Sequence, residues 1–131
     1  LEHRLLRLQG RRVLLVEDNE LNQQVACELL QDAGLKVEVA DNGQIALDKV
    51  QTQPFDLVLM DMQMPIMDGY EATGHIKAVR PDIPVVALTA FALADDIDRC
   101  LDAGCDYYLT KPIQIETFTE ELRSIRERLD V

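Results

Sequence analysis

In the stretch Val13-Leu14-Leu15-Val16-Glu17-Asp18, four consecutive apolar residues are followed at once by two acids, and this pattern is the first indication of the fold. The same order returns at residues 57–61, where Leu-Val-Leu-Met precedes Asp61. A short run that is apolar throughout is typical of a strand covered on both faces, as in a parallel sheet wrapped by helices. We therefore expect two buried strands that each end in acidic residues.

Three further strand candidates lie at residues 35–39, 83–88 and 107–109. The run at 83–88 is also apolar, whereas 35–39 alternates and is expected nearer an edge. Longer amphipathic segments predict helices at residues 20–33, 42–52, 70–79, 93–102 and 115–129. Alternating strands and helices with right-handed crossovers predict an α/β fold, a single doubly wound five-stranded parallel sheet with five helices. In such sheets the active residues gather at the carboxyl ends of the strands.

The helix boundaries rest on a few residues. Asn19 suits an N-cap and Gly34 a C′ stop for the helix at 20–33, in which Leu21, Val25 and Leu29 recur every fourth residue. Gly74 lies inside the helix at 70–79 and costs about 1 kcal/mol relative to Ala. Apolar residues in steps of three and four form one stripe along the last helix: Ile115, Phe118, Leu122, Ile125 and Leu129.

Composition narrows the function. The 131 residues fit one globular domain, and a net charge of −11, from 13 basic and 24 acidic residues, argues against nucleic acid or an anionic membrane as the main partner. Residues 1–12 hold four Arg and one Glu, so the rest is more acidic still. Three cysteines without a CxxC pair argue against a disulfide framework. No apolar run approaches a membrane span and there is no signal-peptide pattern, so we expect a domain in a reducing cytosol.

Polar residues follow four of the predicted strands: Glu17-Asp18, Asp61, Thr89 and Lys111. Three carboxylates at one pole repel one another and are typical ligands of a hard divalent cation, Mg²⁺ being the common intracellular choice. The Thr89 hydroxyl and the Lys111 ammonium suit the oxygens of a phosphoryl group, with Asp61 as the nucleophile. Taken alone, Glu17-Asp18 is more often a turn and helix cap, and only the whole set favours a site.

Four motifs in this order carry a family resemblance: VLLVEDNELNQQVA at 13–26, DLVLMDMQMPIMDG at 56–69, ALTA at 87–90 and AGCDYYLTKP at 103–112. Over residues 11–129 the chain resembles receiver domains of the two-component response-regulator superfamily. The resemblance implies the flavodoxin-like strand order 2-1-3-4-5, which is also the order of the chemotaxis receiver. It implies further that Asp61 accepts a phosphoryl group from a phosphohistidine.

The same resemblance implies the roles of the other site residues. Asp18 and Asp61 would bind Mg²⁺, or Mn²⁺ in its place, with the backbone carbonyl of Gln63, while Glu17 would act mainly through water. Lys111 would pair with the phosphoryl group, ahead of a cis peptide at Pro112. Thr89 and Tyr108 would form the switch pair that changes the surface of the helix at 93–102, the last strand and the last helix.

EDNELNQ and MDMQMPIMDG most resemble receivers of hybrid sensor histidine kinases. We expect a linker at 1–10 and a receiver domain at 11–131, and we expect this domain to be cytoplasmic. The parent protein would be either a hybrid histidine kinase anchored in the inner membrane or a stand-alone regulator. The expected partners are a histidine kinase or a histidine phosphotransfer domain, with no nucleic acid or membrane contact, and the domain would be a monomer or weak dimer. It would not itself be an enzyme, beyond accepting and slowly losing its own phosphoryl group.

Two other functions are open on the residues alone. An aspartate-based phosphatase of the haloacid-dehalogenase type also uses a strand-end Asp and Mg²⁺, but it usually needs a second Asp two residues on, where this chain has Gln63. A pseudo-receiver binds partners without phosphorylation, and its usual sign is the loss of an acidic residue, the acceptor or the lysine. All of these are present here, so we rank the pseudo-receiver low, and Gln63 counts against the phosphatase.

Overall fold

The computed structural model describes residues 10–62, 64, 67–89 and 94–110. Within these ranges, strands and helices alternate strictly along the chain. The nine elements are β1 (Arg12–Val16), α2 (Glu20–Asp32), β2 (Lys36–Ala40), α3 (Gly43–Thr52), β3 (Leu57–Asp61), α4 (Gly69–Val79), β4 (Val85–Thr89), α5 (Ala94–Ala103) and β5 (Tyr107–Thr110).

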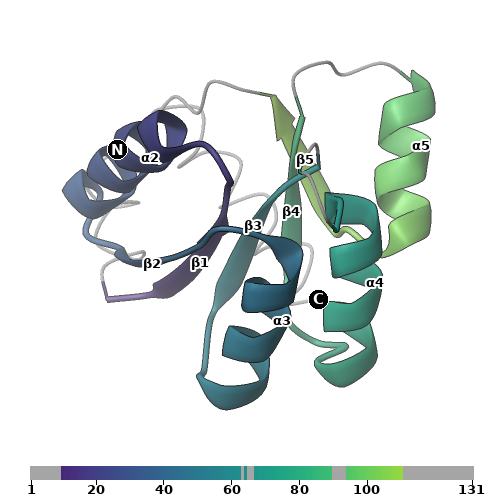
Figure 1. Cartoon of the computed structure of the whole chain (residues 1–131), viewed down its shortest axis with the longest axis horizontal. Helices are drawn as coiled ribbons and strands as arrows, with labels where there is room; N and C mark the ends of the chain where they lie inside the picture. The colour runs from purple at the N-terminus through teal and green to yellow at the C-terminus, as the bar shows by residue number, and fades with distance from the viewer. Residues whose placement is uncertain (1–9, 63, 65–66, 90–93, 111–131) are drawn as a thin grey trace.

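The five strands form one parallel sheet in the order β2-β1-β3-β4-β5 (Figure 1). This confirms the predicted flavodoxin-like sheet and its order, with the alternating strand β2 at an edge. Four helices lie in the described part of the chain, and the fifth predicted helix, at 115–129, lies outside it. The linker predicted at 1–10 likewise lies outside the described residues, apart from Gly10.

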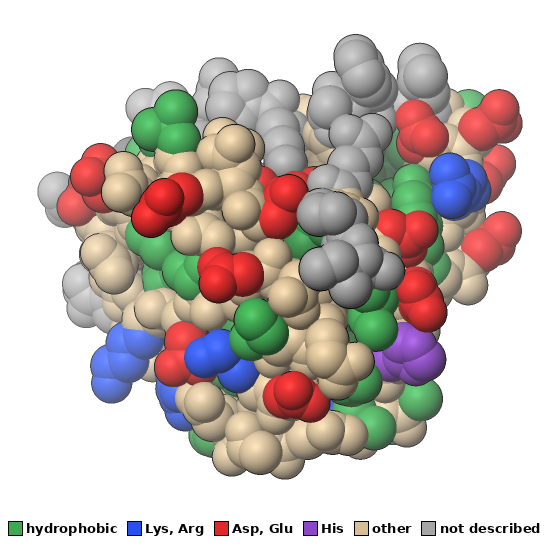
Figure 2. All heavy atoms as spheres, in the orientation of Figure 1, with side chains coloured by type: hydrophobic (Ala, Val, Ile, Leu, Met, Phe, Trp, Pro, Cys, Tyr) green, Lys and Arg blue, Asp and Glu red, His purple; other side chains and the backbone are tan. Residues whose placement is uncertain are grey.

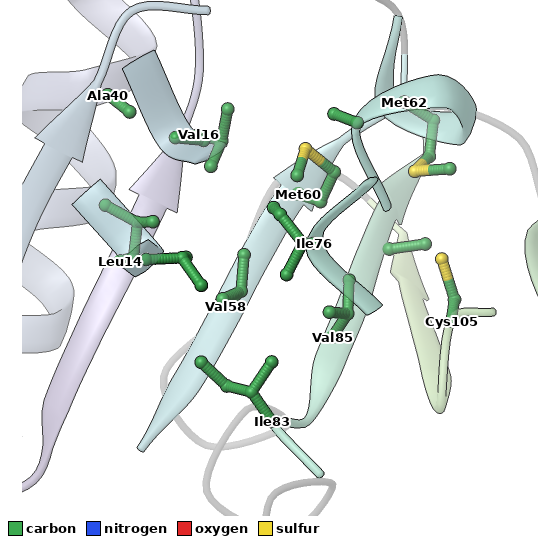
Figure 3. Close-up of a cluster of buried hydrophobic side chains, with 14 of the residues drawn as sticks. Leu14, Val16, Ala40, Val58, Met60, Met62, Ile76, Ile83, Val85 and Cys105 are labelled. Carbon is green, nitrogen blue, oxygen red and sulfur yellow. The ribbon is translucent and has the colours of Figure 1, made fainter. Parts of the chain in front are cut away.

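Alternate residues of each strand face opposite sides of the sheet and build two hydrophobic layers. Leu14 and Val16 of β1 belong to the layer that α3, α4 and α5 cover, and Val13 and Leu15 to the layer that α2 covers. Figure 3 shows the first layer, where side chains of β1, β3 and β4 meet Ile76 of α4. Burial on both faces explains why the central strands are apolar throughout.

Helices α2 and α5 end in the same Schellman geometry, which fixes where the following strands start. After α2, Gly34 has a φ of 87° and its N–H donates to the carbonyl of Gln31 (2.9 Å), while the N–H of Leu35 donates to Leu30 (3.1 Å). Leu35 is therefore part of the helix cap, and β2 begins one residue later than predicted. After α5, Gly104 has a φ of 111° and takes the equivalent position.

The start of β4 also differs from the sequence prediction, for a local reason, whereas the predicted α4 is confirmed. The strand expected at 83–88 starts only at Val85, because the N–H of Ile83 closes a turn onto the carbonyl of Arg80 (3.2 Å) and Pro84 has no N–H to donate. Helix α4 continues through Gly74, with Asp68 as its N-cap. The burial of Ala72, Thr73 and Ile76 therefore outweighs the intrinsic cost of the glycine.

All three cysteines are free thiols, as their number and spacing indicated.

In the described part of the chain, no helix has the length and apolar character needed to cross a bilayer.

Candidate functional site at the carboxyl edge of the sheet

Three carboxylates meet at the carboxyl edge of the sheet: those of Glu17, Asp18 and Asp61. One oxygen from each lies within 4.8 Å of the others. The register explains the convergence, because Val16 pairs with Met60, so that the next residues along, Glu17 and Asp61, lie side by side where β1 and β3 end. Glu17 and Asp61 are each only 3% exposed, whereas Asp18 faces solvent. The strands thus hold two buried acids beside one accessible acid.

The first turn of α2 orients the Glu17 side chain. One of its carboxylate oxygens, Oε1, accepts from the backbone N–H of Asn19 (3.2 Å) and from the side-chain amide of Asn22 (3.4 Å). Asn19 is also the N-cap of α2, and its side chain accepts from the N–H of Asn22 (3.0 Å). The cap predicted from Asn19 is confirmed, and the same turn serves both the helix and the acidic cluster.

Gln23 is a polar contact of this region that the sequence did not single out. Its side-chain nitrogen donates to the backbone carbonyl of Glu17 (2.6 Å) and to Oδ1 of Asp41 (2.8 Å). It therefore links the loop after β1 to the loop after β2. Its place six residues after Glu17, inside the helix that follows the acidic pair, is the only sequence signal that could have found it.

Gly69 brings the start of α4 against the end of β3. A Cβ at this position would lie 2.5 Å from the backbone oxygen of Asp61 and 2.6 Å from Cα of Met62. Only glycine allows this approach without moving backbone. The sequence showed Gly69 as the last residue of a motif, but no pattern indicated that it touches the strand end that carries Asp61.

The remaining predicted site residues divide into described and undescribed positions. Thr89 is buried at the end of β4, on the strand next to β3, and Leu88 before it pairs with Asp61. Tyr108 of β5 pairs with Ala87 and is partly buried against the layer of Figure 3, which fits its reading as core as well as its reading as a switch. Gln63, Lys111 and Pro112 lie outside the described residues.

The oxygen donors fit a small divalent cation. Two oxygens on opposite sides of one Mg²⁺ are separated by about 4.2 Å, and Mg²⁺ usually keeps several waters. Carboxylate oxygens within 4.8 Å of one another therefore suit direct ligation by some groups and contact through water by others. Nitrogen and sulfur ligands, which zinc prefers, are absent from this cluster of described residues.

The surface around the site is acidic, apart from an apolar strip on α2. Figure 2 shows acidic side chains gathered over α5, where the sequence has Asp95, Asp96, Asp98 and Asp102. On α2, Leu21 is 68% and Val25 49% exposed, while Ala26 and Leu30 of the same helix are buried against the sheet. The predicted every-fourth-residue stripe is thus largely an outward face.

Comparison with known proteins identifies the family. Residues 13–123 match the family model for the response regulator receiver domain. The chain is 49% identical over 107 residues to the sensor histidine kinase GacS of Pseudomonas protegens, in a match that covers 78% of this chain. The same match covers only 12% of that kinase, so the chain corresponds to a small part of its length.

Two solved structures share the fold over nearly the whole chain. The receiver domain of the sensor histidine kinase PA1611 from Pseudomonas aeruginosa, with magnesium in its active-site cleft, has a TM-score of 0.80 and 37% identity, covering 93% of this chain and 99% of that one. The receiver domain of Ssk1 in complex with the histidine phosphotransfer protein Ypd1 of Saccharomyces cerevisiae has a TM-score of 0.80 and 29% identity, with 87% of each chain covered.

This chain belongs to the response regulator receiver domain family. It is a receiver domain of two-component signal transduction, and its likeness to the receivers of sensor histidine kinases, predicted from two of its motifs, is confirmed.

Proposed function

We propose that Asp61 accepts a phosphoryl group from a phosphohistidine in a reaction that depends on Mg²⁺. The observation that carries this proposal is the meeting of the Glu17, Asp18 and Asp61 carboxylates, with ligand atoms within 4.8 Å, at the carboxyl edge of the sheet. Asp61 ends the central strand β3 and pairs there with Leu88 of β4. An aspartyl phosphate is an established form of covalent intermediate.

Each residue of the cluster has a distinct part in the proposed reaction. An Asp61 carboxylate oxygen bonds to phosphorus as the phosphorus–nitrogen bond of the donor breaks, and the electron pair stays on the imidazole nitrogen. Asp18 and Asp61 bind Mg²⁺, or Mn²⁺, together with the carbonyl of Gln63, and Glu17 acts through water. When bound, the cation offsets the charge that builds up on the phosphoryl oxygens.

Two further groups complete the proposed site. Lys111 pairs with the phosphoryl oxygens, and the Thr89 hydroxyl turns toward them. Tyr108 then rotates inward and changes the surface formed by α5, β5 and residues 115–129. Support for Thr89 comes from its place at the end of β4, beside the strand of Asp61.

The proposed phosphoryl donor or acceptor is a histidine kinase or histidine phosphotransfer domain that docks on the exposed face of α2. This face is apolar at Leu21 and Val25, and α2 begins directly after the acidic pair, so a partner seated there has its histidine near Asp61. Ssk1, which shares this fold, is described in complex with such a protein, Ypd1.

The proposal extends to the domain bounds, the parent protein, the localisation and the oligomeric state. Residues 1–10 would be a linker and residues 11–131 the receiver, in a hybrid histidine kinase anchored in the inner membrane or in a stand-alone regulator. The domain would be cytoplasmic, a monomer or weak dimer, and free of nucleic-acid and membrane contacts, in keeping with its net charge of −11. It would use its donor stoichiometrically and lose the group slowly, rather than turn over as an enzyme.

The test is the intact mass of the protein after incubation with Mg²⁺ and a small acyl-phosphate or phosphoramidate donor. We expect one phosphoryl adduct on the wild type. No adduct should form when the metal is chelated before the donor is added, or on the variant Asp61→Asn. The variant keeps the size and shape of the side chain, so it should still fold as the wild type does. Undiminished labelling of Asp61→Asn would contradict the assignment of the acceptor, and the absence of any adduct would favour the pseudo-receiver.

A further inference from the structure

The side chain of Gln23 bridges two loops that flank the acidic cluster. One nitrogen, Nε2, donates both to the backbone carbonyl of Glu17 (2.6 Å) and to the carboxylate of Asp41 (2.8 Å). Glu17 belongs to the loop between β1 and α2, and Asp41 to the loop between β2 and α3. No other side chain in the described part of the chain donates hydrogen bonds to both of these loops.

The Glu17 carbonyl needs such a donor because the strand has ended. The N–H of Glu17 still continues the ladder and donates to the carbonyl of Ala40 (3.1 Å). Past Val16, however, the chain leaves the sheet, and a buried carbonyl without a donor is costly. Gln23 supplies the donor from α2, so both backbone groups of Glu17 are held, one by β2 and one by this side chain.

Holding the Glu17 carbonyl also fixes the backbone that leads into Asp18. The carbonyl of Glu17 and the N–H of Asp18 lie in one planar peptide unit, so a bond to the first sets the orientation of the second. Within the described residues, no hydrogen bond reaches the Asp18 carboxylate, and that side chain is exposed. The direction of Asp18 therefore depends on its backbone far more than that of Glu17 does.

The hydrogen bond from Gln23 to Asp41 holds the Gln23 side chain in the position from which it reaches the Glu17 carbonyl. Asp41 lies between the last residue of β2 and Asn42, which is the N-cap of α3. A hydrogen bond to a carboxylate is stronger than one between neutral groups. The amide is thus held from the neighbouring strand end while it holds the Glu17 carbonyl, and the acidic loop is tied to the edge of the sheet.

We propose that Gln23 is a positioning residue for the metal site, which orients Asp18 by fixing the peptide between Glu17 and Asp18 and tying it to Asp41. The inference rests on the proposed function, because it concerns the binding of Mg²⁺ by the same cluster. Gln23 would touch neither the cation nor the phosphoryl group. Its effect is on how well the acidic loop is arranged before the cation binds.

The test compares Gln23→Met with Gln24→Met in the full chain. Methionine has nearly the length and helix propensity of glutamine but donates no hydrogen bond. Gln24 is the exposed neighbour on the same helix, so its variant is a matched control. The Mg²⁺ affinity of each protein is measured by isothermal titration calorimetry, next to its unfolding in the presence of a chelator and its labelling by a small phosphoryl donor.

We expect Gln23→Met to weaken Mg²⁺ binding by about tenfold, since loss of a supporting hydrogen bond around a metal site has effects of this order. At saturating Mg²⁺ the labelling rate should return toward that of the wild type, whereas a merely structural defect would persist. Gln24→Met should bind Mg²⁺ as the wild type does. Equal affinities of the two variants, with a wild type that binds, would overturn the role of Gln23 alone.

A wild type that binds no Mg²⁺ would overturn the proposed function, and this inference with it. Asp41→Ala covers the case in which Gln23→Met fails to fold, because it removes only the anchoring bond at an exposed position. We expect it to weaken Mg²⁺ binding by a smaller factor, and to add little when combined with Gln23→Met, because the two side chains act as one unit. Additive effects of the two changes would contradict the bridge.

Discussion

At the scale of single residues, the side chains that favour cation binding in the acidic cluster also destabilise the metal-free protein. Glu17 and Asp61 are buried, and together with Asp18 they bring three carboxylates within 4.8 Å of one another. Like charges this close repel, and the repulsion is relieved when a cation binds. The arrangement that prepares the site for a metal therefore lowers the stability of the metal-free protein.

Asp18→Asn should separate these two effects. Without metal, we expect the variant to be at least as stable as the wild type, because one of the three charges is gone. With Mg²⁺ at a hundredfold excess over its dissociation constant, the wild type should gain about 2.7 kcal/mol in its free energy of unfolding. The variant should gain much less. Urea unfolding with Mg²⁺ and with a chelator measures both differences.

Asp32→Asn is the control for this comparison, because it removes a charge from the exposed end of α2, away from the cluster. Its gain in stability with Mg²⁺ should equal that of the wild type. The role of Asp18 would be refuted if its variant gained as much stability from Mg²⁺ as the Asp32 variant did.

At the scale of elements, two glycines of α4 have opposite expected responses to alanine. A Cβ at Gly74 would meet nothing within 4 Å, so Gly74→Ala should stabilise the protein by about 1 kcal/mol through helix propensity. A Cβ at Gly69 would meet the backbone of Asp61 and Met62, so Gly69→Ala should destabilise it by about 1–3 kcal/mol or more. Thermal unfolding of the two variants, side by side, tests the pair, and a shift of the same sign in both would contradict this packing.

The end of α5 gives a prediction about pH. Burial raises the pKa of the Cys105 thiol from its ordinary value of 9.0 to about 11, while its hydrogen bond to Thr73 (3.7 Å) acts in the opposite direction. A raised pKa in the folded state means that the folded protein holds the proton more tightly than the unfolded chain. The resulting stability is therefore present below pH 9 and is lost as the pH rises toward about 11.

Cys105→Ser isolates this contribution, because a serine hydroxyl is similar in shape and does not titrate in this range. We expect the loss of stability between pH 9 and 11, measured by urea unfolding, to be less steep in the variant than in the wild type. Other groups that titrate there are common to both proteins and cancel in the difference. Parallel curves would show that Cys105 keeps its ordinary pKa in the folded state.

Most elements could be predicted from the sequence, because the strong periodic signals and the helix ends agree with the packed structure. The errors occur where local hydrogen bonds compete with the pattern, as at Leu35, which completes a helix cap, and at Ile83, which closes a turn. The stripe of Leu21, Val25 and Leu29 correctly predicted a helix but could not reveal its orientation. Ala26 and Leu30 are the residues that face the sheet, and only the tertiary packing decides this.

The candidate site also has features that the sequence predicted and contacts that it did not. Strand ends could be located from apolar runs, so the convergence of Glu17, Asp18 and Asp61 was predictable from topology. The contacts of Gln23 and Gly69 were not, because they join segments far apart in the chain and leave no periodic signal. A glutamine in a helix and a glycine in a loop have many ordinary reasons to be present.

At the scale of the whole molecule, we expect the exposed face of α2 to be needed for phosphorylation by a protein donor but not by a small-molecule donor. Leu21→Asp should slow transfer from a phosphorylated histidine phosphotransfer protein by about tenfold or more, because a charge replaces an apolar anchor at the interface. The rate with a small donor should not change, since that donor needs no docking surface. Time courses with the two donors, followed by intact mass, measure both rates.

Leu101→Asp serves as the matched control, because Leu101 is 52% exposed on α5, on the opposite side of the sheet. It should leave both rates unchanged. If Leu21→Asp were as active as Leu101→Asp with the protein donor, the partner would have to dock elsewhere.

The position of β1 between β2 and β3 also has a consequence for how the chain folds. The first 62 residues alone contain three adjacent strands, β2-β1-β3, so a continuous half-sheet can assemble before β4 and β5 are added. Nearer segments close loops at lower entropic cost, which favours this order. Glu17, Asp18 and Asp61 all lie in the half that forms first, and Thr89 in the half that follows. During synthesis, the chain would therefore bring together the acids of the proposed cation site before it adds the strand that carries Thr89.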